Sequence, residues 1–240
     1  MALQDLLARG IIAYRVQCRP RWRGVGNGWA SVCCFIEQGC YIRRRGIVML
    51  QQEPLPPFDL NGNLPDGVYA CDEATFQERF VTAFPKSRTR ALICEGFLRW
   101  MKEAARAVEA ATQWVDGSFV SENGGEDPKD VDVVTFCDRN YLNRLNEEAT
   151  RAIRALLDGG TSTKPEYHTH TILVACCGTE DPYYPVFESS RLYWRTWFGK
   201  TRDIPDPPGP DRPGNRKGIV EMTIGDAKAC PVISHERSNP

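Results

Sequence analysis

The sequence predicts an α+β fold in which a small mixed sheet is flanked by helices. Helical and extended stretches follow one another in the order helix, strand, strand, helix, strand, helix, strand. The 240 residues, 42% hydrophobic and 25% charged, have the composition of a globular protein that can bury a sizeable core. No apolar run reaches the length of a membrane span, and the mean hydropathy is −0.42. We therefore expect one folded domain with no membrane partner.

Charge is divided unevenly along the chain. Residues 1–48 carry eight Arg, no Lys and two acidic residues, a net charge of +6, whereas the rest carries −7. We expect this Arg- and Cys-rich segment to be disordered or non-native, with translation starting at or near Met49. A targeting peptide and a small Cys-rich metal module are the alternatives. The predicted organisation is this segment, a folded domain at 49–233, and a flexible tail at 234–240.

The first elements of the domain follow from turn residues and helical spacing. Residues 54–69 are rich in Pro, Gly and Asn, which predicts an extended lead-in. Asp72 can cap a short helix. Ser87 opens a longer helix that ends near Ala111, since apolar residues recur on one face.

The later elements alternate strands with helices. Residues 130–136 are β-branched and apolar after two alternating carboxylates, which makes them the clearest strand of the chain. The other expected elements are a strand at 113–116, a helix at 140–157, a strand at 168–177, a helix at 187–198, a Pro-rich loop at 203–215 and a last edge strand at 218–224.

A pair of carboxylates and a small turn form the most informative pattern. Asp130 and Asp132 are two residues apart on a strand, so their side chains point to one face. Two such anions repel each other unless a cation joins them, and Mg²⁺ or Mn²⁺ prefers oxygen ligands. The preceding turn, Gly117-Ser118, can approach a phosphate closely and donate to its oxygens. The alternative is a hairpin with two solvated carboxylates, and Asp116 is expected to be structural.

These residues resemble the Gly-Ser and Asp-x-Asp signature of polymerase-beta-like nucleotidyltransferases, and residues 53–224 are similar to a small bacterial family of that kind. The resemblance implies that Asp130 and Asp132 are catalytic and bind Mg²⁺ or Mn²⁺, and that Gly117 and Ser118 hold the phosphates of a nucleoside triphosphate, with ATP expected. Arg202 and Lys217 are further expected substrate-binding residues, because one or two basic side chains can hold the triphosphate. Arg88, Arg90, Arg191, Arg195 and Lys200 are the other basic candidates.

The chain departs from that superfamily at the third carboxylate. The resemblance places this acid on the strand at 168–177, which contains none. His170 can take its role as a base, because the pKa of histidine lies near neutrality. Glu166 and His168 share its parity and would share its face, and Glu221 is another candidate. The alternative is that both histidines are polar residues at a sheet edge.

The resulting functional hypothesis is metal-dependent transfer of a nucleoside monophosphate to a hydroxyl of an RNA, a protein or a small molecule. A catalytically lapsed fold that acts as a binding or antitoxin-like partner is the alternative, and a metal-dependent phosphohydrolase is a third. Toxin–antitoxin or phage-defence systems are the context suggested by analogy. Scattered cysteines and the lack of a secretory signal predict a cytoplasmic location.

Overall fold

The computed structural model describes residues 55–122, 127–201 and 216–225. The expectations for 1–48, for 234–240 and for Arg202 lie outside these residues. The strands are β1 (Val68–Ala70), β2 (Ala110–Asp116), β3 (Val131–Asp138), β4 (Thr169–Cys176) and β5 (Ile219–Gly225). The helices are α2 (Glu73–Gln77), α3 (Arg90–Ala107), α4 (Arg139–Asn143), α5 (Glu147–Leu157), α6 (Lys164–Tyr167) and α7 (Tyr184–Phe198). A π-helical turn at Glu78–Thr82 and 3₁₀ turns at Ser118–Val120 and Thr161–Thr163 complete the described elements.

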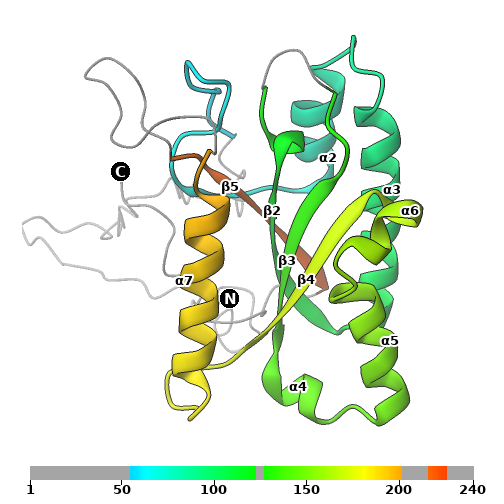
Figure 1. Ribbon diagram of the computed structural model, residues 1–240, viewed down its shortest axis with the longest axis vertical. Helices are drawn as coiled ribbons and strands as arrows, with labels where there is room; N and C mark the ends of the chain where they lie inside the picture. The colour runs from blue at the N-terminus through cyan, green and yellow to red at the C-terminus, as the bar shows by residue number, and fades with distance from the viewer. Residues whose placement is uncertain (1–54, 123–126, 202–215, 226–240) are drawn as a thin grey trace, which may run out of the picture. The chain divides into compact units, whose positions relative to one another are not determined.

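The five strands form one mixed sheet in the order β1-β5-β2-β3-β4, which confirms the predicted α+β class (Figure 1). β1 is parallel to β5 and β3 is parallel to β4, whereas β2 is antiparallel to both of its neighbours. The prediction that the last strand lies at an edge was wrong. β5 lies between β1 and β2, with most of its side chains buried, because a short segment that was expected mainly as a lead-in pairs along its outer side.

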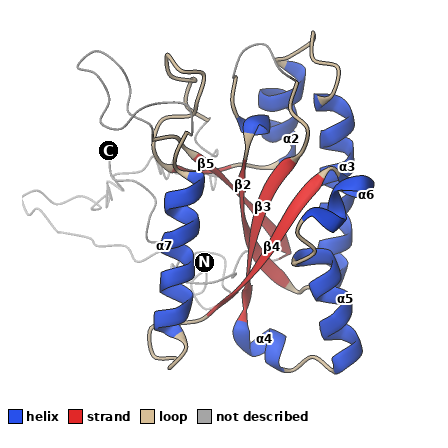
Figure 2. Cartoon of the chain, in the orientation of Figure 1, coloured by secondary structure: helices blue, strands red, loops and turns tan. Residues whose placement is uncertain are grey.

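Figure 2 shows α7 on one face of the sheet and α3 and α5 on the other, and the alternation of side chains along the strands gives each face its own core layer. On one face, side chains from β2, β3 and β5 pack with α3 and α5. The strand and helix residues buried there include Val115, Val133, Val220, Phe97, Trp100 and Leu157. On the other face, α7 is the helix that packs on the sheet among the described elements. The residues buried beneath it include Trp114, Val134, Phe136, Ile219, Phe187 and Phe198.

Capping side chains explain where the helices begin. Asp72 caps α2 as predicted, its carboxylate accepting from the backbone N–H of Thr75 at 2.7 Å. The single helix expected at 140–157 is two helices. Asn146 interrupts it, because its side chain accepts from the N–H of Ala149 and starts α5 afresh.

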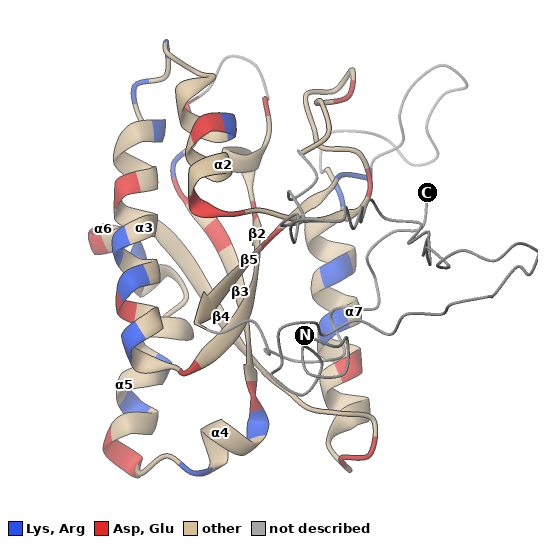
Figure 3. Ribbon diagram, turned by 180° about the vertical axis from the view of Figure 1, so that it is seen from behind, with Lys and Arg blue, Asp and Glu red and all other residues tan. Residues whose placement is uncertain are grey.

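The described helices carry charged residues of both signs on their outer surfaces (Figure 3). None of the helices in the described part of the chain combines the length and apolarity needed to cross a membrane.

Candidate functional site

Three polar side chains lie in a row across neighbouring ends of β2, β3 and β4. The strand register pairs Asp132 of β3 with Asp116 of β2 on one side and with His170 of β4 on the other. Residues paired in this way project to the same face of a sheet. Trp114, two residues before Asp116, is buried beneath α7, so the row belongs to the α7 face.

Asp132 and His170 form the accessible part of this row. Their side chains are 30% and 33% exposed, and Asp132 Oδ1 lies 3.0 Å from His170 Nδ1. A carboxylate at this distance accepts a hydrogen bond from Nδ1–H, and in this tautomer Nε2 is the acceptor nitrogen of the ring. The arrangement therefore joins an acid and a potential base, both open to a ligand.

The Gly-Ser turn lies directly against Asp132. Gly117 adopts φ +95°, a conformation that residues with a side chain rarely accept. A Cβ at this position would stand 2.9 Å from Asp132 Oδ2, which is closer than such atoms approach. Glycine is thus required both by the backbone and by the neighbouring carboxylate.

A buried arginine holds the segment that follows this glycine. Arg90, at the start of α3, donates from Nη1 to the carbonyls of Phe80 and Phe119 and from Nη2 to that of Ser121. Burial lowers the pKa of this guanidinium, and its Cζ lies 3.9 Å from the ring centre of Phe84. Arg90 is therefore a positioning residue for the turn, whereas sequence reasoning grouped it with the triphosphate candidates. Ser118 itself remains exposed.

Asp116, which was expected to be structural, is the buried member of the row. It is 4% exposed, and its Oδ1 lies 2.8 Å from Lys217 Nζ. Burial raises the pKa of Asp116 to about 7; the nearby Lys217 opposes this rise and the charge of Asp132 adds to it. The hairpin register between β2 and β3 is the signal that links Asp116 to Asp132. Lys217, expected to bind substrate, thus has a carboxylate partner.

Asp130 has a different partner from Asp132. It precedes the first residue of β3, and its carboxylate forms an ion pair with Lys164 of α6. The described contacts therefore bring Asp132, Gly117, His170 and Asp116 together, and they connect Asp130 to the start of α6.

The other candidates for the third acid lie elsewhere. His168 ends α6 in a left-handed conformation, and Glu166 belongs to that helix, so neither shares a strand face with His170. The predicted strand began one residue too early because the helix closes at His168. Glu221 of β5 is buried and accepts from Trp114 Nε1 at 3.3 Å, within the core beneath α7.

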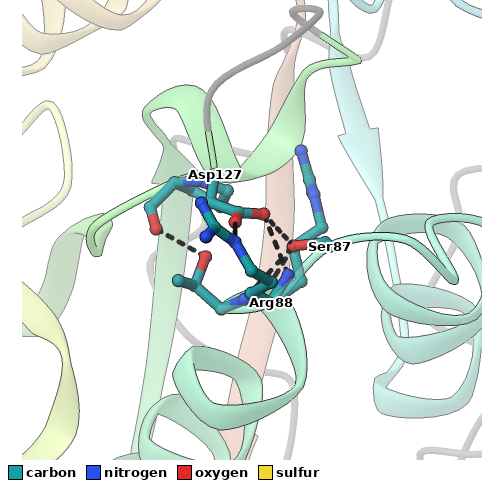
Figure 4. A network of polar contacts seen from close by, with 6 residues as sticks. Ser87, Arg88 and Asp127 are labelled. Atoms are coloured by element: carbon teal, nitrogen blue, oxygen red, sulfur yellow. Dashed lines mark hydrogen bonds and ion pairs between the residues drawn. The ribbon is translucent and has the colours of Figure 1, made fainter.

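Two further basic candidates, Arg88 before α3 and Arg191 of α7, also have acidic partners within the protein. Asp127 accepts from the Ser87 hydroxyl and from the backbone and side chain of Arg88, which ties the start of α3 to the segment before β3 (Figure 4). Arg191 pairs with Glu188 within α7.

The donor set can be compared with what a metal requires. Among the described residues, no group of three or more His, Cys, Asp or Glu side chains is arranged to hold a metal ion. Mg²⁺ commonly takes only one or two protein carboxylates and completes its shell with phosphate oxygens and water. The accessible carboxylate of Asp132 suits that mode of binding together with a nucleotide, whereas Asp130, two residues before it, is paired with Lys164.

The fold and the site define an α+β protein with acidic and histidine side chains beside a glycine turn. Residues 56–223, more than half of the chain, match the model of a family of unknown function, DUF6932. The chain belongs to this family. Comparison with curated proteins and with solved structures gave no significant match.

Proposed function

We propose that this protein binds a nucleoside triphosphate with Mg²⁺ and transfers the nucleoside monophosphate to a hydroxyl group of an acceptor. The observation that carries the proposal is the contact between the Gly117 turn and Asp132. A Cβ at residue 117 would stand 2.9 Å from Asp132 Oδ2, so a phosphate held at the turn would also lie beside this carboxylate.

Each side chain of the site has a role in this proposal. Asp132, with Asp130, would hold Mg²⁺, and the exposed Ser118 would donate to phosphate oxygens. When bound, Mg²⁺ supplies positive charge that stabilises the phosphate oxygens during the reaction. Asp116 and Lys217 would keep the end of β2 in place beside the turn, since their ion pair is almost fully buried.

His170 would act as the base in place of a third carboxylate. Asp132 orients the ring through Nδ1, and Nε2 accepts the proton of the acceptor hydroxyl. The hydroxyl oxygen forms a bond to the α-phosphorus as the bond from that phosphorus to the bridging oxygen breaks. Pyrophosphate leaves with that oxygen and its electron pair.

The test is transfer of label from an α-³²P nucleoside triphosphate to RNA, protein or small-molecule acceptors in the presence of Mg²⁺. We expect D132N and H170N to lose at least about a hundredfold in rate, the usual scale for losing a general base. D138N is the matched control, because Asp138 lies at the far end of β3 and only caps α4, a role that Asn fills equally well. Equal labelling by wild type and D132N would refute the proposal, and release of inorganic phosphate would indicate hydrolysis instead.

One observation favours the alternative, a lapsed fold that acts as a binding or antitoxin-like partner. Asp116, Asp130 and Asp132 each contact a basic side chain of the protein itself. The labelling assay and the phenotype of cells that carry D132N together separate the two functions. The alternative predicts no transfer to any acceptor and no effect of D132N on that phenotype.

We infer a cytoplasmic location from the cysteines. Among the described cysteines, Cys71 and Cys94 are buried thiols outside any disulfide, which suits a reducing compartment.

A further inference from the structure

A cavity with basic walls lies at the C-terminal end of α7, apart from the Gly117 turn. Its volume is about 180 Å³, far more than the roughly 10–15 Å³ that one water requires. The residues that line it are Asp66, Arg195, Thr196, Gly199, Lys200 and Arg216. Among these described wall residues, three carry a positive charge and one is a carboxylate.

The carboxylate of Asp66 pairs with both arginines and orients them. Asp66 Oδ1 accepts from Arg195 at 2.7 Å, and Oδ2 accepts from Arg216 at 2.9 Å. The three residues come from distant parts of the chain, so the tertiary structure builds the cluster. Gly199 leaves space for it, because a Cβ there would stand 2.5 Å from Arg195 Nη1.

Lys217 connects this cavity to the acidic row. Its backbone N–H donates to the carbonyl of Gly199, a residue of the cavity wall, at 3.0 Å. Its side chain reaches Asp116, where Nζ lies 2.8 Å from Oδ1. One residue thus touches both the cavity and the candidate active site.

We propose that this cavity binds a phosphate group, as a second site besides the turn at Gly117. Planar guanidinium groups match phosphate oxygens with paired hydrogen bonds, and Lys200 adds an exposed charge. The C-terminal end of α7 carries roughly half a negative charge, which disfavours a bound anion. The three cationic side chains of the wall outweigh this partial charge. The phosphate belongs either to the tail of the nucleotide or to the acceptor. This assignment rests on the proposed function, whereas the binding of phosphate in the cavity does not.

Isothermal titration of the full chain with inorganic tripolyphosphate, without Mg²⁺, tests the binding. We expect saturable binding that R195Q and R216Q each weaken at least fivefold. R216Q keeps the test valid if R195Q fails to fold, because the Arg216 side chain is 73% exposed. The matched control is R151Q, which removes an exposed, ion-paired arginine from α5 and should change affinity less than twofold. Absence of saturable binding, or equal binding by R216Q and wild type, would overturn the proposal.

Two displacement experiments identify the source of the phosphate. A comparison with the transfer assay separates phosphate binding in the cavity from the proposed function. Displacement of tripolyphosphate by ATP, lost in R216Q, assigns the cavity to the nucleotide tail. Displacement by a dinucleotide that carries one phosphodiester assigns it to the acceptor. If D132N and wild type both lack transfer while tripolyphosphate binding stays sensitive to R216Q, the cavity proposal stands and the proposed function fails.

Discussion

Asp116 and Asp132 lie directly opposite each other on the antiparallel strands β2 and β3, yet they occupy different environments. Asp116 is buried with Lys217, and its pKa is raised to about 7, whereas the Asp132 side chain is 30% exposed beside His170. The pair therefore divides into a buried acid that holds the strand end and an accessible acid that can meet a ligand.

The raised pKa of Asp116 predicts a pH-dependent stability. The unfolded chain releases this proton near the ordinary value of 3.8, whereas the folded protein keeps it until about pH 7. The contribution of Asp116 to the free energy of unfolding is therefore complete below about pH 4 and falls as the pH rises to about 7. Urea unfolding of wild type and D116N in metal-free buffer, from pH 4.5 to 8, measures this. The stability of wild type relative to D116N should fall over that range and level off above pH 7; parallel curves would contradict the prediction.

The turn beside Asp132 predicts a specific glycine requirement. G117A places a Cβ against Asp132 Oδ2 and forces alanine into φ +95°, so we expect a loss of about 1–3 kcal/mol in the free energy of unfolding. G178A is the matched control, because nothing lies within 4 Å of its Cβ position. Chemical denaturation of both variants gives the comparison. A G117A protein as stable as G178A would show that neither the contact nor the conformation is constrained as described.

The buried guanidinium of Arg90 predicts a large loss when it is removed. R90M leaves the carbonyls of Phe80, Phe119 and Ser121 without their donor, which we expect to cost about 3 kcal/mol. The neighbouring R88M removes a side chain that is 90% exposed and should cost less than about 1 kcal/mol. Thermal or urea unfolding of the two variants measures the difference. Similar losses in both would mean that the buried network contributes little.

Burial also predicts unreactive cysteines. It raises the pKa of Cys94 to about 11 and that of Cys71 to about 12, so almost no thiolate forms at neutral pH. Iodoacetamide at pH 7.5, followed by peptide mass spectrometry, should leave both unmodified in the native protein. Both should be alkylated after denaturation in urea, which serves as the control. Rapid modification of Cys94 in the native state would contradict its buried environment.

Local patterns were enough to predict most elements of the fold. The β-branched run at 130–136 lies almost wholly within β3, and Asp72 caps α2 as expected, because both depend on residues close in the chain. Element ends were less predictable. Asn146 could be read either as a helical residue or as a cap, and the structure uses its side chain as a cap.

What the sequence determined by itself is the alternation of helices and strands, and with it the α+β class and the nearness of a glycine turn to a carboxylate strand. Only the tertiary structure decided which side chains meet. The pairing of Asp132 with both Asp116 and His170, the place of β5 inside the sheet, and the cluster around Asp66 all depend on strand register and on contacts between residues far apart in the chain. Hydrophobic periodicity specifies which face of an element is buried, but it does not specify the neighbouring element against which that face packs.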